Sequence, residues 1–428
     1  MTAREQGAPR VVITGMGAVT DLGLDAPTTW RAVREGQSGI RTIQGEGFDR
    51  ELDKWAVTIA GQVQNFNPDD VMDPREARRL DRVTHLGVGA AVEAVRQSGI
   101  DFTKENPERC GVCIGSGVGG ISTIEESVKV LESRGAHRIN PFTVPRLMVN
   151  AVAGNLSIRY GLMGPAGAHA TACASSGHAI ADAVQQIRLG RADVMLVGGA
   201  EAAVTPLCVG AFMTMKALSS RNDEPTRASR PFDQDRDGFV LAEGAACFVL
   251  ESEAHAKARG AEILGLLVGY GNSSDASHIT APDPEGRGAA RSMRWALEDA
   301  GLDPTDIDYV NAHGTSTPLG DKAEVAAVLS VFGDHARKST GGKLRMSSTK
   351  SVHGHTLGAS GAVELVACLE AIRERVVPPT INLEKPDAGA DVHLVPNQAE
   401  SHPIRYAMNN TFGFGGHNVT LIAGRYDA

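Results

Sequence analysis

The sequence has few cysteines, few aromatic residues and no long hydrophobic run, and each shortage excludes a class of protein. Six cysteines among 428 residues do not make a disulfide framework, and only 4% of the residues are aromatic. No run of about 18 apolar residues occurs, so we expect no transmembrane helix and no membrane partner. The N-terminal MTAREQGAPR contains no apolar stretch of signal-peptide length. We therefore expect no export signal and a cytoplasmic protein.

Basic residues are fewer than acidic ones. The chain has 42 Lys and Arg against 51 Asp and Glu, and its net charge of −9 argues against general binding to nucleic acid. A local basic patch is compatible with this balance. Glycine is abundant instead, with 49 residues, and this indicates many tight turns and close backbone approaches.

Strand-like runs alternate with helix-like runs along the chain. RCGVCIGSG (109–117) is typical of a buried strand, and HAIADAVQQIRLG (178–190) is typical of a helix that ends at Gly190. Such alternation predicts an α/β fold with layered sheets. A first half ends near residue 260, and AEILGLLVGYG begins a second half, so we expect domains at 1–260 and 261–428.

The two halves share a weak internal echo. CASSGHAIADAVQQI (173–187) resembles GASGAVELVACLEAI (358–372), with Ser176-Gly177 matched to Ser360-Gly361. Each segment is a turn of small residues that opens a helix. Internal duplication would give two similar domains.

Three short motifs suggest cofactor or metal sites, but each lacks a required partner. GSGVGG (115–120) fits a dinucleotide-binding pattern, yet no acidic residue follows in the right setting, so close backbone packing explains it better. Cys110 and Cys113 in CGVC have no second cysteine pair and no nearby histidine. His353 and His355 in HGH have no carboxylate or thiolate partner at suitable spacing. We expect no metal site from these motifs.

Cys173 has a different setting from the other cysteines. It lies in HATACASSGHAI (169–180), where tiny residues surround the passage from a strand to a helix. The amides and dipole at a helix N-terminus favour a thiolate, so we expect a lowered pKa for this thiol. Taken alone, a small core residue is the more ordinary interpretation. That interpretation applies to the remaining cysteines: Cys110, Cys113, Cys208, Cys247 and Cys368.

Polar motifs in the second half give Cys173 partners. NAHGTSTPLGDKAE places His313 at the end of a predicted strand, and SSTKSVHGHTLGASGAVE contains His355. NNTFGFGGHN is a glycine-rich loop with two phenylalanines. A cysteine and two histidines on strand-end loops indicate a candidate cysteine and histidine site.

Five motifs occur in one order along nearly the whole chain: ACASSGHAI, RPFDQDRDGFVLAEGA, NAHGTSTPLGD, STKSVHGHTLGASGAVE and FGFGGHN. In these motifs the chain resembles the elongating β-ketoacyl-acyl-carrier-protein synthases, most closely their synthase II branch. The resemblance implies the thiolase-like fold, two duplicated halves in α-β-α-β-α layers, and a homodimer. It also implies decarboxylative Claisen condensation of acyl chains with malonyl-acyl-carrier protein, giving β-ketoacyl-acyl-carrier protein and CO2 in fatty acid elongation.

The resemblance also assigns roles to residues. Cys173 takes the acyl chain, while His313 and His355 promote decarboxylation and stabilise the enolate. The backbone N–H groups of Cys173 and Phe412 form the oxyanion hole, and Phe412 is also the gate. Lys350 and Glu364 form a supporting ion pair. Thr315 and Thr317 hold the pantetheine arm. No cofactor is implied beyond the phosphopantetheine that carries the substrates, and no metal.

The implied partner, acyl-carrier protein, is acidic, so docking needs a local basic surface. DPREARRLDR supplies three arginines at helical spacing, and two further arginines stand at matching places in the family pattern: Arg75, Arg78 and Arg79, then Arg138 and Arg221. An ordinary solvated helix face is the competing interpretation.

Other functions stay open at this level. A free-standing ketosynthase of a polyketide or aryl polyene pathway would look much the same, although HGTST fits fatty acid synthases better. A thiolase acting on coenzyme A would want a second catalytic cysteine near the C-terminus, and Cys368, the last cysteine, lies in a helix-like segment. A non-catalytic scaffold that binds acyl-carrier protein is the third alternative.

Overall fold

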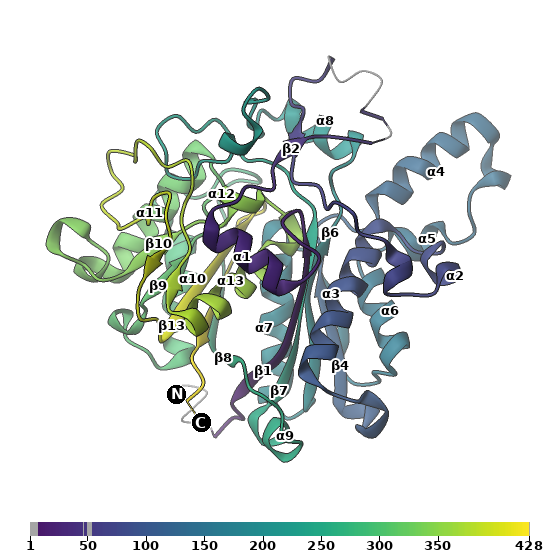
Figure 1. Ribbon diagram of the computed structural model, residues 1–428, viewed down its shortest axis with the longest axis horizontal. Helices are drawn as coiled ribbons and strands as arrows, with labels where there is room; N and C mark the ends of the chain where they lie inside the picture. The colour runs from purple at the N-terminus through teal and green to yellow at the C-terminus, as the bar shows by residue number, and fades with distance from the viewer. Residues whose placement is uncertain (1–6, 46, 49–53, 428) are drawn as a thin grey trace.

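The computed structural model describes residues 7–45, 47–48 and 54–427, and is built around one sheet of ten strands (Figure 1). Residues 1–6, part of the segment from which no export signal is expected, lie outside the described residues. The first half supplies five strands, which in sheet order from the edge inward are β5 (Ala166–His169), β4 (Cys110–Gly115), β6 (Val194–Glu201), β7 (Gly244–Ser252) and β1 (Val11–Thr20).

The second half repeats this arrangement. Its strands, again from the edge inward, are β10 (Arg345–Ser347), β9 (Tyr309–Asn311), β13 (Tyr406–Gly413), β14 (His417–Gly424) and β8 (Gly265–Ser274). In each half the two outer pairings are parallel and the two inner pairings are antiparallel. The halves join where β1 pairs with β8, with Val11 opposite Leu267. The α/β fold with duplicated halves is therefore confirmed.

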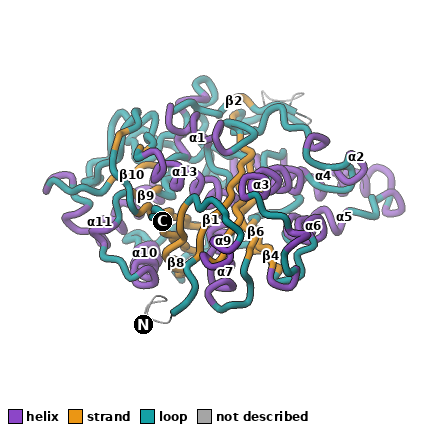
Figure 2. Tube along the Cα trace, turned by 60° about the horizontal axis from the view of Figure 1, so that its bottom comes forward, coloured by secondary structure: helices purple, strands orange, loops and turns teal. Residues whose placement is uncertain are grey.

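Helices form three layers around this sheet. α7 (Ser175–Arg188) and α13 (Ser360–Glu374) pack against each other and against strands of both halves, in the middle of the molecule (Figure 1). α13 is buried on nearly every side because it lies in this middle layer. The outer layer on the first half is formed by α3 (Arg82–Ser98) and α6 (Ala151–Tyr160). The outer layer on the second half is formed by α10 (Arg287–Ala300) and α11 (Pro318–Phe332). The order of layers is α-β-α-β-α, and Figure 2 shows helices on both sides of the strands.

Local sequence sets the ends of these helices. The Asp81 side chain caps α3 by accepting a hydrogen bond from the N–H of Val83, and Gly99 ends the helix in the left-handed region at φ 65°. α10 ends in the same way at Gly301, with φ 64°.

The shorter elements lie around this frame. They are α1 (Ala26–Glu35), α2 (Pro74–Ala77), α4 (Ile121–Arg134), α5 (Thr143–Leu147), α8 (Pro206–Thr214), α9 (Glu253–Ala258) and α12 (Lys350–His353), with the strand pairs β2 (Arg41–Thr42) and β3 (Ile59–Ala60), and β11 (Val376–Val377) and β12 (Glu400–Ser401). Among the helices of the described residues, none has the length and apolar character needed to cross a membrane. The predicted domain boundary falls in the connection between α9 and β8 and stays a prediction.

Each middle helix begins with a tight turn in an uncommon conformation. The turns are η6 (Ala172–Ala174) before α7 and η11 (Leu357–Ala359) before α13. Ala172 and Leu357 open them with positive φ values of 50° and 44°, which side chains other than glycine rarely adopt. The structure matches Ser175 with Ser360, so the echo seen in the sequence is offset by one residue.

Candidate active site

Cys173 is the middle residue of the η6 turn, directly before α7. The Ser175 hydroxyl fixes this turn, because its Oγ accepts a hydrogen bond from the N–H of Thr171 at 2.9 Å and donates one to the carbonyl of Ala172 at 2.6 Å. Gly413 packs against the turn so closely that a Cβ there would lie 2.7 Å from the carbonyl oxygen of Thr171. The thiol of Cys173 is therefore held in one place, and it is buried.

His355 reaches Cys173 from the second half. Its Nε2 lies 3.0 Å from the Sγ of Cys173, and its Nδ1 lies 2.8 Å from the Oγ of Ser360. The backbone of His355 is also anchored, because its N–H donates to the carbonyl of Val240 at 2.7 Å. With the Nδ1 proton donated to Ser360, Nε2 is free to accept the proton of the thiol.

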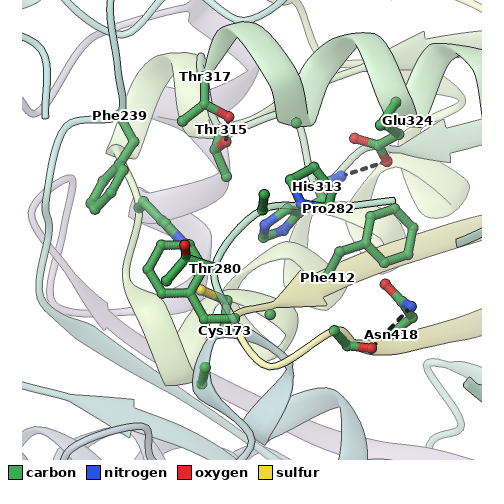
Figure 3. Close-up of a pocket in the computed structure, with 18 of the residues that line it drawn as sticks. Cys173, Phe239, Thr280, Pro282, His313, Thr315, Thr317, Glu324, Phe412 and Asn418 are labelled. Atoms are coloured by element: carbon green, nitrogen blue, oxygen red, sulfur yellow. Dashed lines mark hydrogen bonds between the residues drawn. The ribbon is translucent and has the colours of Figure 1, made fainter. Parts of the chain in front are cut away.

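His313 is the second imidazole of the site and follows β9. Its ring centre lies 5.4 Å from that of His355 and 5.7 Å from that of Phe412. The buried carboxylate of Glu324, on α11, accepts hydrogen bonds from the backbone N–H of His313 at 2.9 Å and of Gly314 at 2.7 Å (Figure 3). Within the described part of the chain, the Nδ1 of His313 is buried without a hydrogen-bond partner. His313 therefore places a second imidazole within 4.8 Å of the sulfur of Cys173.

The electrostatics of the site favour neutral groups. Burial, reinforced by the charge of Lys350, lowers the pKa values of His313 and His355 well below the ordinary value. Burial raises the pKa of Cys173 to about 12, although Lys350 and the backbone N–H of Phe414 act in the opposite direction. The lowered pKa that the sequence predicts for Cys173 is wrong, because burial outweighs the favourable amides and charge. The resting pair is a neutral thiol beside a neutral imidazole.

Lys350 and Glu364 form a buried ion pair next to the histidines. Lys350 is the first residue of α12, Glu364 lies on α13, and both side chains are inaccessible to solvent. Burial raises the pKa of Glu364 to about 7, and the attraction of Lys350 opposes that rise. The predicted pairing of these two residues is confirmed, and it places a positive charge near the reacting groups.

A cavity of about 300 Å³ opens onto the three reactive side chains (Figure 3). Apolar side chains line part of it, among them Val118, Phe212 and Phe239. Thr315 and Thr317 line another part, with their hydroxyl oxygens 3.0 Å apart. The cavity therefore offers an apolar lining for a hydrocarbon chain and hydroxyl groups for a polar arm.

The two phenylalanines of FGF have different surroundings. Phe412 lies on β13 opposite Asn418 of β14, and its ring lies beside that of His313. Phe414 follows β13, and its backbone N–H lies against the sulfur of Cys173. The resemblance assigns the second oxyanion donor to the backbone N–H of Phe412, whereas the backbone N–H that lies next to the sulfur belongs to Phe414, two residues later in the same glycine-rich loop.

The three arginines expected on one helix do not share a regular helix. α2 covers only four residues, Pro74–Ala77, so Arg75 lies in it while Arg78 and Arg79 follow it. All three side chains are exposed, and the guanidinium of Arg79 lies 5.2 Å from the ring centre of Phe142. They form a local group of positive charges on the surface.

The other two predicted docking arginines differ from each other. Arg138 is exposed at the end of a short 3-10 turn. Arg221 is half-buried, donates a hydrogen bond to the carbonyl of Asp235 at 2.6 Å, and lies 3.8 Å from the carboxylate of Asp237. Its charge is therefore partly neutralised within the chain.

The glycine-rich segment 115–120 packs as expected. Its Gly117 and Val118 N–H groups donate to the buried carboxylate of Glu201 at 2.7 and 3.3 Å. A Cβ at Gly115 would lie 2.3 Å from the backbone of Ser175. Close backbone packing, rather than dinucleotide binding, accounts for these glycines.

The remaining motifs also separate in space. Cys110 and Cys113 belong to cores on opposite faces of β4, so they do not form a chelating pair. His353 contacts the hydroxyl of Thr349 at 3.1 Å, whereas His355 faces Cys173. The sulfur of Cys173 and the ring nitrogens of His313 and His355 lie within 4.8 Å of one another, a spacing that a metal ion could also bridge.

The sequence matches two family models, described as "Beta-ketoacyl synthase, N-terminal domain" over residues 8–256 and "Beta-ketoacyl synthase, C-terminal domain" over residues 264–384. It is 45% identical over 419 residues to 3-oxoacyl-[acyl-carrier-protein] synthase 2 of Staphylococcus aureus (strain COL), covering 98% of this chain and 99% of that protein. The protein of the same name from Vibrio harveyi is 46% identical over 413 residues, covering 96% and 98%. A solved type II polyketide synthase ketosynthase, bound to a hexaketide and in complex with its acyl-carrier protein, superimposes with a TM-score of 0.89 at 31% identity, covering 98% of this chain and all of that one.

Proposed function

The chain belongs to the β-ketoacyl synthase family, and from that premise we propose that it is an elongating 3-oxoacyl-[acyl-carrier-protein] synthase. It condenses an acyl chain, delivered by acyl-carrier protein, with malonyl-acyl-carrier protein, and releases β-ketoacyl-acyl-carrier protein and CO2. One observation carries this proposal. The thiol of Cys173 lies 3.0 Å from His355, beside a second neutral imidazole with an unpartnered nitrogen, at an apolar cavity.

Acyl transfer to Cys173 is the first half-reaction. The Sγ attacks the thioester carbonyl as its proton passes to Nε2 of His355, and that proton then goes to the departing pantetheine sulfur. The oxyanion formed during attack accepts hydrogen bonds from the backbone N–H groups of Cys173 and Phe414, both of which favour negative charge at the sulfur in the resting site. We assign the second donor to Phe414 rather than Phe412, whose ring instead covers His313.

Condensation is the second half-reaction. The malonyl group loses CO2, and the enolate oxygen accepts hydrogen bonds from His313 and His355, which burial and Lys350 keep neutral. For His355 to donate from Nε2, its proton moves from Nδ1 to Nε2, and Nδ1 then accepts a hydrogen bond from the hydroxyl of Ser360. The enolate carbon attacks the thioester carbonyl on Cys173, the sulfur leaves, and a proton from solvent restores the thiol. No step needs a metal or a cofactor, and activity that survives dialysis against a chelator tests this.

The substrate arm and its carrier fit the entrance of the cavity. Thr315 and Thr317 offer hydroxyls to the amides of a pantetheine arm. The exposed Arg75, Arg78 and Arg79 offer positive charge to an acidic carrier protein, and Arg138 adds to it. Arg221, tied to its own acidic neighbours, contributes less. Charge reversal at Arg78 should raise KM for acyl-carrier-protein substrates at low salt and leave KM for acyl-pantetheine unchanged.

A homodimer is the assembly we propose. β5 is an edge strand of the ten-stranded sheet, and its free edge presents backbone groups that a second copy could pair. The chain also carries exposed apolar side chains that a second copy could cover, among them Val128, Leu131, Phe142 and Val144. Sedimentation velocity tests this, and a monomer at micromolar concentration would contradict it. A cytoplasmic location and a domain boundary between residues 260 and 261 stay predictions.

A polyketide ketosynthase is the second candidate, favoured by the solved hexaketide-bound neighbour. A fatty acid enzyme extends a saturated chain once before the keto group is reduced. A polyketide enzyme extends its own keto product repeatedly.

One experiment separates these candidates and tests the proposal. Octanoyl-acyl-carrier protein and malonyl-acyl-carrier protein are mixed with the chain alone, and the carrier species are weighed by mass spectrometry. A single product two carbons longer supports fatty acid elongation. Products longer by several two-carbon units, formed without a reductase, would support the polyketide role, and no product would contradict both.

A further inference from the structure

A second cluster of metal-ligating side chains lies outside the active site. Cys113 is on β4, His169 ends β5, and Asp182 is on α7. The Oδ2 of Asp182 lies 3.8 Å from the Sγ of Cys113 and 3.6 Å from the Nε2 of His169. One ligand atom from each residue lies within 4.8 Å of the other two. Three neighbouring elements thus present a thiol, an imidazole and a carboxylate to one point.

We propose that Cys113, His169 and Asp182 bind a divalent transition metal, and that zinc is the preferred ion. Zinc bonds of about 2.3 Å to sulfur and about 2.0–2.2 Å to nitrogen or oxygen place tetrahedral ligand atoms about 3.3–3.6 Å apart. The separations of 3.6 and 3.8 Å are close to this spacing. The thiol of Cys113 donates a hydrogen bond to Oδ2 of Asp182 at 3.8 Å, and an ion would replace the proton of that bond. The sulfur of Cys113 and the ring nitrogen of His169 lie within 4.8 Å of each other, so these two atoms must move closer together when the ion binds.

Charge and chemistry agree with this assignment. A thiolate and a carboxylate together balance the charge of one divalent cation, and the imidazole adds a neutral ligand. Burial raises the pKa of the Cys113 thiol, so binding must displace its proton. The combination of sulfur, nitrogen and oxygen ligands is one that zinc accepts and that magnesium and calcium do not.

The surroundings hold the ligands in position. The side-chain amide of Gln186 donates to Oδ1 of Asp182 at 3.1 Å, which leaves Oδ2 directed at the cluster. The carbonyl of His169 accepts a hydrogen bond from the N–H of Ser116 at 3.0 Å, which fixes the end of β5 against β4. Such outer contacts orient ligands in metal sites.

The cluster is also accessible to an ion. In the single chain the side chains of His169 and Asp182 are 33% and 36% exposed, so an ion can reach them before a second copy pairs with β5. His178 lies on α7, as Asp182 does, and its ring stacks on that of His169 with 6.3 Å between the ring centres. A bound ion would tie the edge strand β5 to β4 and to α7, the helix that Cys173 precedes.

The test must separate this site from the active site, which contains its own cysteine and histidines. Cys173→Ser protein therefore serves as the parent, stripped with a chelator, incubated with one equivalent of zinc, and desalted. Elemental analysis should find about one zinc per chain. His169→Gln and Asp182→Asn in this parent should retain almost none, and Gln186→Ala should bind zinc about tenfold more weakly in a competition titration.

A cobalt experiment identifies the sulfur ligand. Cobalt in the Cys173→Ser parent should give a thiolate-to-metal charge-transfer band, which Cys113→Ser should abolish. Cys110→Ser is the matched control, because Cys110 lies on the same strand but faces the opposite core, and it should keep the band.

Two results would overturn the proposal: a Cys173→Ser parent that retains no zinc, or retention unchanged by His169→Gln and Asp182→Asn. If a variant fails to fold by circular dichroism, the parent decides instead, since a melting temperature that zinc does not raise excludes binding to the folded state. Neither outcome depends on condensing activity.

Discussion

The two halves of the molecule share one architecture but contribute different chemistry. Both place a tight turn with a positive φ before a buried central helix, at Ala172 in the first half and Leu357 in the second. The middle residue of the turn is Cys173 in one half and Gly358 in the other. The N–H of Gly358 donates to Glu201 at 3.0 Å, and a Cβ there would lie 2.3 Å from the backbone of Gly117. The second turn has no room for a nucleophile, so duplication supplies the frame and packing decides the role.

The connections that lead into these turns differ in length, and this difference explains how the second half supplies His355. β5 reaches its turn through residues 170–171, whereas β10 reaches the equivalent turn through residues 348–356. The longer connection contains α12, Lys350 and His355, and it carries the imidazole across to Cys173. The nucleophile of one half therefore depends on the base of the other.

The turns that follow the equivalent strands β4 and β9 share a device. Each is held by a buried carboxylate that accepts two backbone N–H groups, Glu201 in the first half and Glu324 in the second. The first turn lines the apolar part of the cavity with Val118, and the second presents His313. The same construction positions a wall in one half and a catalytic imidazole in the other.

The largest effect should come from removing the nucleophile alone. Cys173→Ser should lower condensation by a factor on the order of 10⁵, because the serine hydroxyl is a far weaker nucleophile than the thiol. The histidines of the second half stay in place, so decarboxylation of malonyl-acyl-carrier protein should continue. Release of CO2 measures this, and an equal loss of both activities would show that the halves do not divide the chemistry.

His355→Ala should affect both half-reactions, because this residue faces the thiol and the enolate. Loss of a proton acceptor typically costs about 10²–10⁴ in rate. Rapid-quench measurements should show that acyl transfer to Cys173 is slowed by a factor in this range. Ser360→Ala removes only the hydrogen-bond partner of Nδ1 and should have a smaller effect. Acyl transfer at the normal rate in His355→Ala would remove this residue from the first step.

The neutral thiol predicts a pH dependence. The pKa of Cys173 is raised to about 12, so the thiolate is a minor species at neutral pH and increases about tenfold per pH unit below that value. Alkylation of the resting protein by iodoacetamide should rise about 100-fold between pH 7 and pH 9. A rate that is already constant above pH 6 would indicate a thiolate–imidazolium pair instead.

The smallest effect tests the packing of the second turn. Gly358→Ala should destabilise the fold by about 1–3 kcal/mol, because its Cβ meets Glu201 and the backbone of Gly117. Cys173→Ala removes only a sulfur from the equivalent turn and should cost less. Urea unfolding of both variants measures the difference, and equal stability would mean that the two turns are equally tolerant.

The sequence predicted the frame and the reacting side chains because both are encoded locally. Alternating strand-like and helix-like runs, with Gly190 just after a helix, were enough to predict the α/β class. Cys173, His313 and His355 each follow a recognisable strand and come together in space.

Features that depend on three-dimensional packing could not be predicted. The pKa of Cys173 is raised mainly because the folded chain buries the thiol, and the extent of that burial depends on every element packed around it. Glu324 lies inside a motif that the sequence analysis examined, yet only the fold brings its carboxylate to the amides of His313. Phe412 and Phe414 are two residues apart in one loop, and the choice between their amides depends on how that loop turns past Cys173.

The central claim is that the first half captures the acyl chain and the second half drives condensation. Intact mass spectrometry of wild-type and His313→Ala protein, first with octanoyl-acyl-carrier protein and then with malonyl-acyl-carrier protein, tests it most directly. The account predicts an acyl adduct on Cys173 in both proteins, consumed quickly by the wild type and about 10²–10³-fold more slowly by the variant. Equal consumption by both proteins, or no adduct on the wild type with any acyl length, would contradict it.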